Sequence, residues 1–310
     1  MSAFKISANY RGKQRNGSAM RVLRRFDPWK SQLCTCPPKY SLHPYTGCSH
    51  FCLYCYATSY IGRHKSSPKK NFIKNLLHDL KRADKSLPVA ISTSSDPYPP
   101  EENKYCLTRR AIEALLDHGF KIIIVSKSNL VIRDINLFKK GRVTVSLTIT
   151  TLDDRLAKII EPFAPPPRER VEAIRLLTRA DIPVSVRIDP IIWGLNDDPQ
   201  DLRELVRVVS DAGAKHVVAS VYKVKPDNLA RLSAAFPDLA DKWHRLYFGE
   251  GESISGYRYL RRNLRMKLLF PVVDEAARLN VSYATCREGL LSKTFFNAPS
   301  CDGTHLLNYS

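Results

Sequence analysis

The alternation of strand-like and helix-like segments along this 310-residue chain restricts its fold more than any other feature. Short apolar runs rich in β-branched residues are separated by segments with helical periodicity, several of which begin near proline and end at glycine. The predicted strands are residues 39–43, 88–93, 121–127, 142–150, 184–192 and 216–224. The predicted helices between them are residues 107–119, 130–141, 166–181 and 198–213. Strands and helices that alternate at this spacing form a parallel sheet covered by helices.

The six predicted strands are too few for a closed eight-stranded barrel, so an open sheet or a partial barrel is expected. In such sheets the chemistry lies at the carboxyl ends of the strands. We expect three regions: an irregular basic N-terminal extension over residues 1–37, a core over 38–226, and a C-terminal extension over 227–310. Helices are predicted in the last region near 227–247 and 260–279, and the tail is expected to be irregular.

Three cysteines lie close together in the loop after the first predicted strand. Cys48, Cys52 and Cys55 have the spacing C-x3-C-x2-C, and the next cysteine in the chain is Cys106. A closed structural zinc site has four protein ligands. Three thiolates without a near fourth would leave one position of a metal centre open to another molecule. A zinc knuckle, or three cysteines that simply pack in the core, are the alternatives.

The chain carries a large positive charge. Its formal net charge is +19 and its isoelectric point is near 9.7. Such an excess attracts polyanions, nucleic acid above all. The basic residues are concentrated at 11–30, 63–81 and 258–267, and each group is equally compatible with an ordinary solvated face. A basic housekeeping enzyme, or one that binds small phosphorylated ligands, is the alternative.

The composition also bears on location. With 44% hydrophobic and 25% charged residues, the chain is typical of globular enzymes. No apolar run approaches the roughly 20 residues that span a bilayer, and the N-terminus has no apolar segment of a signal peptide, so no membrane association is predicted. The eight cysteines are clustered rather than spread as a disulfide framework, which predicts a reducing, cytoplasmic location and metal binding.

The residues GCSHFCLYCYA, at 47–57, resemble the cluster loop of the radical S-adenosylmethionine (radical SAM) superfamily. This resemblance implies that Cys48, Cys52 and Cys55 bind three irons of a [4Fe–4S] cluster, whose fourth iron takes the amino and carboxylate groups of SAM. Three longer segments extend the resemblance to the spore photoproduct lyase-like branch: STSSDPYPPEENKYCLTRRAIEAL, VTVSLTITTLDDRLAKIIEPFAPPPRERVEAIRLL and IPVSVRIDPIIWGLND. It covers residues 40–225 and implies a partial (βα)6 barrel, in agreement with the strand count.

The resemblance also implies roles for polar residues that follow the strands. The implied SAM-binding residues are Ser94, Ser95, Asp96, Lys127, Ser146, Thr148 and Arg187. The first three would meet the amino group, although such a turn is also ordinary after a strand. Lys127 would pair with the carboxylate, and Ser146 and Thr148 would contact the ribose. Arg187 and Asp189, at the end of the fifth predicted strand, are expected to face the same open end of the barrel. An internal ion pair between them is the alternative.

The tyrosines beside the last cysteine, Tyr54 and Tyr56, match spore photoproduct lyase and are the expected catalytic residues. One position departs from that enzyme. Where it has a cysteine that returns hydrogen to the product radical, this chain has approximately Thr93. A hydroxyl O–H bond is too strong to donate hydrogen readily to a carbon radical. The radical-generating machinery is therefore implied by the resemblance, but the repair reaction is not.

Four further cysteines flank the core. Cys34 and Cys36 precede it, and Cys286 and Cys301 follow it. They are candidates for a second metal site, with zinc or an auxiliary iron–sulfur cluster, and His305 is a possible substitute ligand. Unrelated thiols are the alternative, since no CxxC pair is present. Cys106 is expected to be structural.

The function expected from these observations is that of a radical SAM enzyme. One electron delivered to the cluster would cleave SAM to methionine and a 5′-deoxyadenosyl radical, which abstracts hydrogen from a substrate. Nucleic acid is the expected substrate, for lesion repair or base modification, and a base in a duplex would have to be extruded. Ferredoxin or flavodoxin is the expected electron donor. The alternatives are a protein or small-metabolite substrate, or a nucleic-acid-binding iron–sulfur protein without SAM chemistry.

Overall fold

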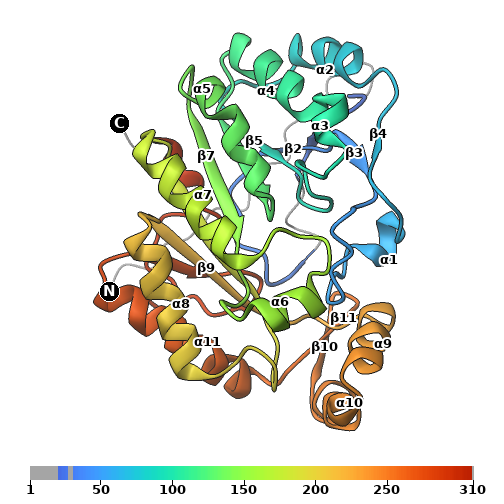
Figure 1. The fold of residues 1–310 in the computed structure, drawn as a ribbon, viewed down its shortest axis with the longest axis vertical. Coiled ribbons are helices and arrows are strands. Elements are labelled where there is room, and N and C mark those ends of the chain that lie inside the picture. Colours follow the sequence, from blue (N-terminus) through green and yellow to red (C-terminus); the bar gives the residue numbers. More distant parts are fainter. Residues whose placement is uncertain (1–19, 27–30, 309–310) are drawn as a thin grey trace.

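A computed structural model describes residues 20–26 and 31–308, and its centre is one eight-stranded sheet (Figure 1). The strand order is β1 (Arg24–Arg25), β2 (Tyr40–Leu42), β5 (Val89–Ile91), β6 (Ile122–Ser126), β7 (Val143–Thr148), β8 (Val184–Ile191), β9 (His216–Val221) and β12 (Ser282–Thr285). All neighbouring pairs are parallel except β1 with β2. The predicted α/β fold with a mostly parallel sheet is confirmed, and the six predicted strands are β2 and β5 to β9.

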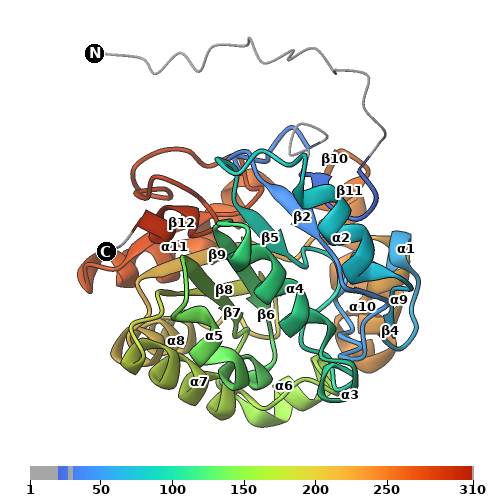
Figure 2. The same ribbon diagram turned by 90° about the horizontal axis from the view of Figure 1, so that it is seen from above.

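The strands are curved into an arc with helices outside it (Figure 2). The covering helices include α4 (Leu107–Asp117), α7 (Pro167–Arg179) and α8 (Pro199–Asp211), each of which follows a strand and buries an apolar face. Asp198 caps α8 by accepting hydrogen bonds from the backbone N–H groups of Gln200 and Asp201. A proline in the first turn of α7 and of α8 suits these starts, because its missing N–H would be unpaired there in any case.

Side chains on each strand alternate between the helix-covered face and the inner face of the arc. Val145 and Leu147 of β7, for example, belong to the main apolar core. Their neighbours Ser146 and Thr148 are buried polar residues on the opposite face. The inner face of the arc is therefore much more polar than the outer one.

The remaining elements are shorter. The other α-helices are α1 (Thr58–Ile61), α2 (Phe72–Leu80), α3 (Glu102–Tyr105), α5 (Ile135–Phe138), α6 (Asp154–Ile160), α9 (Pro226–Ala235), α10 (Pro237–His244) and α11 (Arg262–Arg278). η2 (Asn129–Asp134) and η4 (Thr304–Asn308) are 3-10 helices, and η3 (Arg245–Gly249) is a short π-helix. β3 (Tyr45–Thr46) pairs antiparallel with β4 (Ser67–Pro68), and β10 (Glu252–Ile254) forms a hairpin with β11 (Tyr257–Tyr259). Within the described ranges, no helix combines the length and apolar character needed to cross a membrane.

Two predicted helices differ from the structure. The helix predicted near 227–247 is divided into α9 and α10 at Pro237, because proline lacks an N–H and forces Phe236 before it out of the helical region. The helix predicted over 130–141 begins as a 3-10 turn, in which the Ser128 hydroxyl accepts from the N–H of Leu130, and only 135–138 is α-helical.

The C-terminal segment is more ordered than predicted. Instead of being irregular throughout, it contributes β12, which pairs in parallel with β9 from Ser282 opposite His216 to Thr285 opposite Ala219. Further on, Leu307 packs inside the arc against Ala90 and Ile123. The sheet therefore includes strands from outside the expected core region, and the boundaries at 37 and 226 stay predictions.

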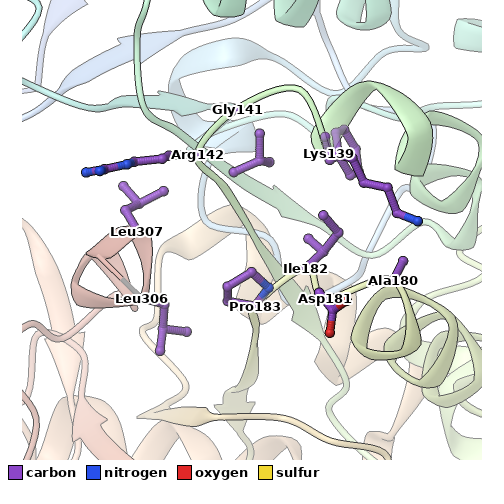
Figure 3. Close-up of a pocket in the computed structure, with 11 residues that line it drawn as sticks. Lys139, Gly141, Arg142, Ala180, Asp181, Ile182, Pro183, Leu306 and Leu307 are labelled. Atoms are coloured by element: carbon purple, nitrogen blue, oxygen red, sulfur yellow. The ribbon is translucent and has the colours of Figure 1, made fainter. Parts of the chain in front are cut away.

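A cavity of about 340 Å³ opens where the tail meets the amino-terminal ends of β7 and β8 (Figure 3). Leu306 and Leu307 form one wall of it, and Arg142 and Pro183 lie on the strand side. It lies at the end of the sheet opposite the polar residues predicted to form the site. The candidate active site is therefore at the other end of the sheet, at the carboxyl ends of the strands.

Candidate active site

The cysteine loop follows β2 of the main sheet and the short strand β3, and it is held by backbone contacts. Gly47 has a φ of +72°, and a Cβ there would lie 2.4 Å from the His64 ring, so only glycine lets the two segments pass this closely. The N–H of Cys48 donates to the carbonyl of His64 at 3.0 Å, and the N–H of Cys55 donates to the carbonyl of Cys52 at 3.3 Å. The loop is thus positioned without help from its sulfur atoms.

The three thiols of this loop lie near enough to affect each other's ionisation. Burial, with a smaller contribution from Asp96, raises the pKa of Cys48 to about 11. Burial also raises the pKa of Cys52, while the Lys127 ammonium opposes that shift. Thiolates here would need a bound cation to be stable, and metal binding supplies one. This chemistry fits a metal cluster.

No group of three or more His, Cys, Asp or Glu side chains in the described ranges is arranged around a single metal ion. This does not conflict with a [4Fe–4S] cluster, because its thiolates bind separate irons and need not surround one point. The donor set of the loop, three cysteines in eight residues, is what such a cluster takes.

Asp96 is fixed at the carboxyl ends of β5 and β6. One of its oxygens accepts from the Ser126 hydroxyl at 2.7 Å and the other from the N–H of Lys127 at 2.7 Å. The two preceding serines make weaker contacts: Ser94 Oγ lies 3.4 Å from Nδ1 of His43, and Ser95 Oγ lies 3.4 Å from a backbone carbonyl. The three residues expected to meet the SAM amino group therefore lie in one turn, with Asp96 the most firmly held.

Lys127 extends from the end of β6 toward the cysteine loop. Its Nζ lies 5.5 Å from the ring centroid of Tyr54. Burial alone would lower the pKa of Lys127, but Cys52 and Glu161 raise it above its ordinary value. Lys127 is thus a charged ammonium beside the proposed cluster, which is where a partner for the SAM carboxylate is expected.

Tyr54 and Glu161 form the centre of a buried group that sequence reasoning missed. The Tyr54 hydroxyl donates to Glu161, which also accepts from Thr150 Oγ1 at 3.1 Å. Arg170 forms an ion pair with the second oxygen of Glu161 at 2.5 Å and donates to the carbonyl of Thr148 at 3.0 Å. Burial would raise the pKa of Glu161, but Arg170 and Lys127 lower it, so the carboxylate is ionised.

Tyr56 lies in a different environment. Its ring meets the ring of Tyr257, on the β10–β11 hairpin, edge to face at 5.5 Å. The Arg287 guanidinium lies 4.5 Å from the Tyr257 centroid and 5.6 Å from the Tyr56 centroid, and Lys225 Nζ lies 4.2 Å from that of Tyr257. We call Tyr56, Tyr257, Arg287 and Lys225 the aromatic–cation cluster. Sequence reasoning missed three of its four members because they lie about 170 to 230 residues from the cysteine loop.

The predicted residues on β7 and β8 also share the inner face of the arc. Thr148 and Arg187 are paired across the two strands. Arg187 donates to Asp189 at 2.8 Å, so the internal ion pair that was the alternative for these residues is present. Thr93 stands where spore photoproduct lyase has its hydrogen-donating cysteine. Its Oγ1 lies 3.5 Å from Nε2 of His43.

Several buried side chains in this region have polar atoms without hydrogen-bond partners among the described residues. They include both ring nitrogens of His50, which is 2% exposed, and Oγ of Ser146. His50 Nε2 is 3.8 Å from Asp96, too far for a hydrogen bond. Buried polar groups are almost always paired, and the ammonium, carboxylate and hydroxyls of SAM are partners of the right kind. The residues present therefore fit this cofactor.

The four cysteines that flank the core behave differently from Cys106 and His305. Cys36 and Cys301 are in contact, and Cys34 and Cys286 lie near them. His305 is bonded to Ser300 and Ser282 and packs on His216 instead. Cys106 lies apart from them, between α3 and α4.

The sheet is curved and parallel, three cysteines follow an early strand, and charged residues lie at the carboxyl ends of the strands. This combination defines a class of enzymes that bind a metal cluster and a cofactor at the mouth of a partial barrel. The sequence matches the Radical SAM superfamily over residues 42–209, more than half of the chain, and the protein belongs to that superfamily. It is a radical SAM enzyme.

Relatives extend over much of the chain. An uncharacterised protein of Mycobacterium bovis is 27% identical over 230 residues, which is 68% of each chain. An uncharacterised protein of Methanocaldococcus jannaschii is 34% identical over 163 residues, 51% of this chain and 62% of that one. A protein of Pseudomonas phage M6 named radical SAM Nalpha-GlyT isomerase is 25% identical over 255 residues, 79% of this chain and 53% of that one.

Solved structures of spore photoproduct lyase share the fold. A variant with bound dinucleoside spore photoproduct superimposes with a TM-score of 0.60 at 15% identity, covering 79% of this chain and 75% of that one. A second variant, with bound AdoMet and the same photoproduct, superimposes with a TM-score of 0.61 at 15% identity. The match covers 86% of this chain and 79% of that one. These similarities confirm the expected barrel fold.

Proposed function

We propose that this radical SAM enzyme acts on nucleic acid, in lesion repair or base modification. The observation that carries the proposal is the aromatic–cation cluster next to the cysteine loop. Tyrosine rings are platforms for bases, and arginine and lysine bind phosphates or stack on bases. The net charge of +19 supports a polyanionic partner. The lesion-bound structures of spore photoproduct lyase show that this fold accommodates a dinucleoside, and the chemistry at this mouth agrees with such a ligand.

The proposed cofactors are a [4Fe–4S] cluster on Cys48, Cys52 and Cys55, and SAM. When bound and reduced, they would supply a 5′-deoxyadenosyl radical that abstracts hydrogen from the substrate. We assign the SAM amino group to Asp96, Ser94 and Ser95, and its carboxylate to Lys127, because a charge-assisted pair is strongest with a buried ammonium. Ser146, Thr148 and Arg187 are proposed to contact the rest of the cofactor from the inner face.

We propose distinct roles for the two tyrosines expected to be catalytic. Tyr54 has its hydroxyl bound to Glu161 and its ring beside Lys127, so it would hold the cluster loop and orient the ammonium. Tyr56 belongs to the aromatic–cation cluster and would contact the substrate. The buried inner face would keep water away from the radical.

We propose that the electron donor is a small carrier such as ferredoxin or flavodoxin, and that the enzyme works in the cytoplasm. All eight cysteines lie in the described ranges and are free thiols, which supports a reducing compartment.

The test measures SAM cleavage in the presence of different candidate substrates. Anaerobically reconstituted enzyme with SAM and dithionite is incubated with damaged DNA, undamaged DNA, RNA, peptides or a metabolite extract, and 5′-deoxyadenosine is quantified. Stimulation by a nucleic acid and a mass change in that nucleic acid support the proposal. Stimulation by peptides or a metabolite extract alone contradicts the substrate class, and no cleavage under any condition contradicts SAM chemistry.

A further inference from the structure

Four cysteines outside the cluster loop meet on the side of the molecule where the chain before the sheet and the chain after it lie together. Cys34 and Cys36 precede β2, Cys286 follows β12 directly, and Cys301 lies in the tail. The sulfur atoms of Cys36 and Cys301 are 3.5 Å apart, across 265 residues of sequence. Cys34 and Cys286 lie near enough to this pair to affect its ionisation. We call these residues the four-thiol cluster.

The four-thiol cluster bridges the open side of the partial barrel. β2 and β12 are the first and last parallel strands of the sheet, so the residues flanking them belong to opposite edges. Figure 2 shows the segment before β2 and the segment after β12 on the same side of the arc, and the buried ion pair between Lys39 and Asp302 joins them. The thiols lie where the two edges would otherwise be separate.

Two buried cations also lie near the sulfur atoms, one beside β2 and one on β8. Lys39 is buried and interacts electrostatically with Cys36 and Cys301 as well as with Asp302. Arg187, on the inner face, interacts electrostatically with Cys286. These two positive charges would partly balance the negative charge of a four-thiolate metal site.

Two simpler explanations, a disulfide bond and ordinary buried thiols, explain less of the arrangement of these four cysteines. A disulfide between Cys36 and Cys301 would have its sulfur atoms at about 2.05 Å and would leave Cys34 and Cys286 unexplained. Ordinary buried thiols pack among apolar side chains. Here, however, four thiols from both ends of the chain meet beside Lys39 and Arg187. A tetrahedral zinc with thiolate bonds of about 2.3 Å holds neighbouring sulfur atoms about 3.8 Å apart, close to the spacing of Cys36 and Cys301.

We propose that Cys34, Cys36, Cys286 and Cys301 bind one tetrahedral metal ion, zinc by preference, that fastens the two open edges of the barrel together. Four thiolates select zinc or iron–sulfur centres among biological metals. Binding requires Cys34 and Cys286 to turn their side chains toward the Cys36–Cys301 pair, since the four are not yet gathered around one point. Because Cys286 contacts Arg187, the metal would also support the polar inner face next to the proposed SAM site.

The decisive experiment measures metal in full-length protein that cannot hold the first cluster. In the variant with Cys48, Cys52 and Cys55 all replaced by alanine, we expect about one equivalent of zinc, as a closed four-thiolate site predicts. Cobalt substituted for zinc should give intense thiolate-to-metal absorption. Both signals should be lost on adding Cys36→Ser or Cys286→Ser, and retained with Cys106→Ser, a matched thiol outside the group.

A second measurement uses the unmodified protein, in case the triple variant does not fold. Zinc X-ray absorption should show four sulfur ligands at about 2.3 Å. A folded triple variant that holds no metal and has five reactive thiols would overturn the proposal. A Cys36–Cys301 disulfide, or iron–sulfur absorption lost with Cys286→Ser, would overturn the single-ion assignment. None of these readouts depends on SAM cleavage, so they are independent of the proposed function.

Discussion

The hydroxyl of Tyr54 donates a hydrogen bond to the carboxylate of Glu161, 107 residues further along the chain. Tyr54 stands between two cysteines of the loop, and Glu161 directly follows α6. Because Arg170 of α7 pairs with the same carboxylate, the cysteine loop is tied to the outer helices through buried polar contacts. Replacing members of this group should therefore affect both stability and the loop.

Glu161→Ala should destabilise the fold strongly. It leaves Arg170 charged, buried and without its ion-pair partner, and breaking a buried pair in this way costs about 3–5 kcal/mol. Glu161→Gln is the matched variant, because its amide oxygen still accepts a hydrogen bond from the Tyr54 hydroxyl. It should lose less unfolding free energy than Glu161→Ala. Urea unfolding at pH 7 measures both. Equal stability of Glu161→Ala and the unmodified protein would refute the role of this group.

Stability should also depend on acid pH through Glu161. Arg170 and Lys127 hold its folded-state pKa below the ordinary value of 4.5, against the opposing effect of burial. Its contribution is therefore fully present above about pH 4.5 and is lost as the pH falls toward the folded-state pKa. The loss of unfolding free energy between about pH 5 and about pH 3 should be smaller in Glu161→Gln, which has no such proton to bind. Identical pH profiles for the two proteins would contradict this linkage.

Removing one loop cysteine should abolish the proposed cluster. Cys52→Ala deletes the most buried of the three thiols and should remove the reduced-state electron paramagnetic resonance signal and all SAM cleavage. Cys106→Ser is the control and should keep both. Cleavage at the original rate in Cys52→Ala would disprove the assignment of the cluster to this loop.

Loss of the Lys127 ammonium should weaken SAM binding with the cluster retained. A charge-assisted pair is worth about 1.5–3 kcal/mol, so Lys127→Met, which fills a similar volume, should raise the Kd for SAM by roughly one to two orders of magnitude. Iron content should not change. Equilibrium binding of SAM to the reconstituted protein provides the measurement, and an unaltered Kd would exclude Lys127 as the carboxylate partner.

Nucleic-acid binding should weaken steeply with salt and depend on the aromatic–cation cluster. Arg287→Ala and Lys225→Ala should each reduce the slope of log K against log salt by about one if the residue binds a phosphate of duplex DNA. Arg168→Ala, an exposed arginine on α7, is the control and should leave the slope unchanged. Equal effects of all three substitutions would point to general charge rather than to this cluster.

Helices and long strands were predictable because their signals are local. β6 and β7 are continuous runs of β-branched and apolar residues, and α8 has its cap, proline and periodicity within a few residues. The strand β12 was missed because Ser282–Thr285 has only four residues, too few for a clear alternating pattern, and its pairing with β9 makes it a strand. The break between α9 and α10 has a local signal, Pro237, because proline cannot continue a helix through its missing N–H.

The sequence by itself determined the three-cysteine loop, the parallel α/β fold and the polar residues at the strand ends. Each of these depends on residues only a few positions apart. The tertiary structure alone decided that Tyr54 meets Glu161, that Tyr56 meets Tyr257, and that Cys36 meets Cys301. These contacts join segments more than 100 residues apart, and no local pattern records them. They depend on how the curved sheet brings its two edges and its loops together.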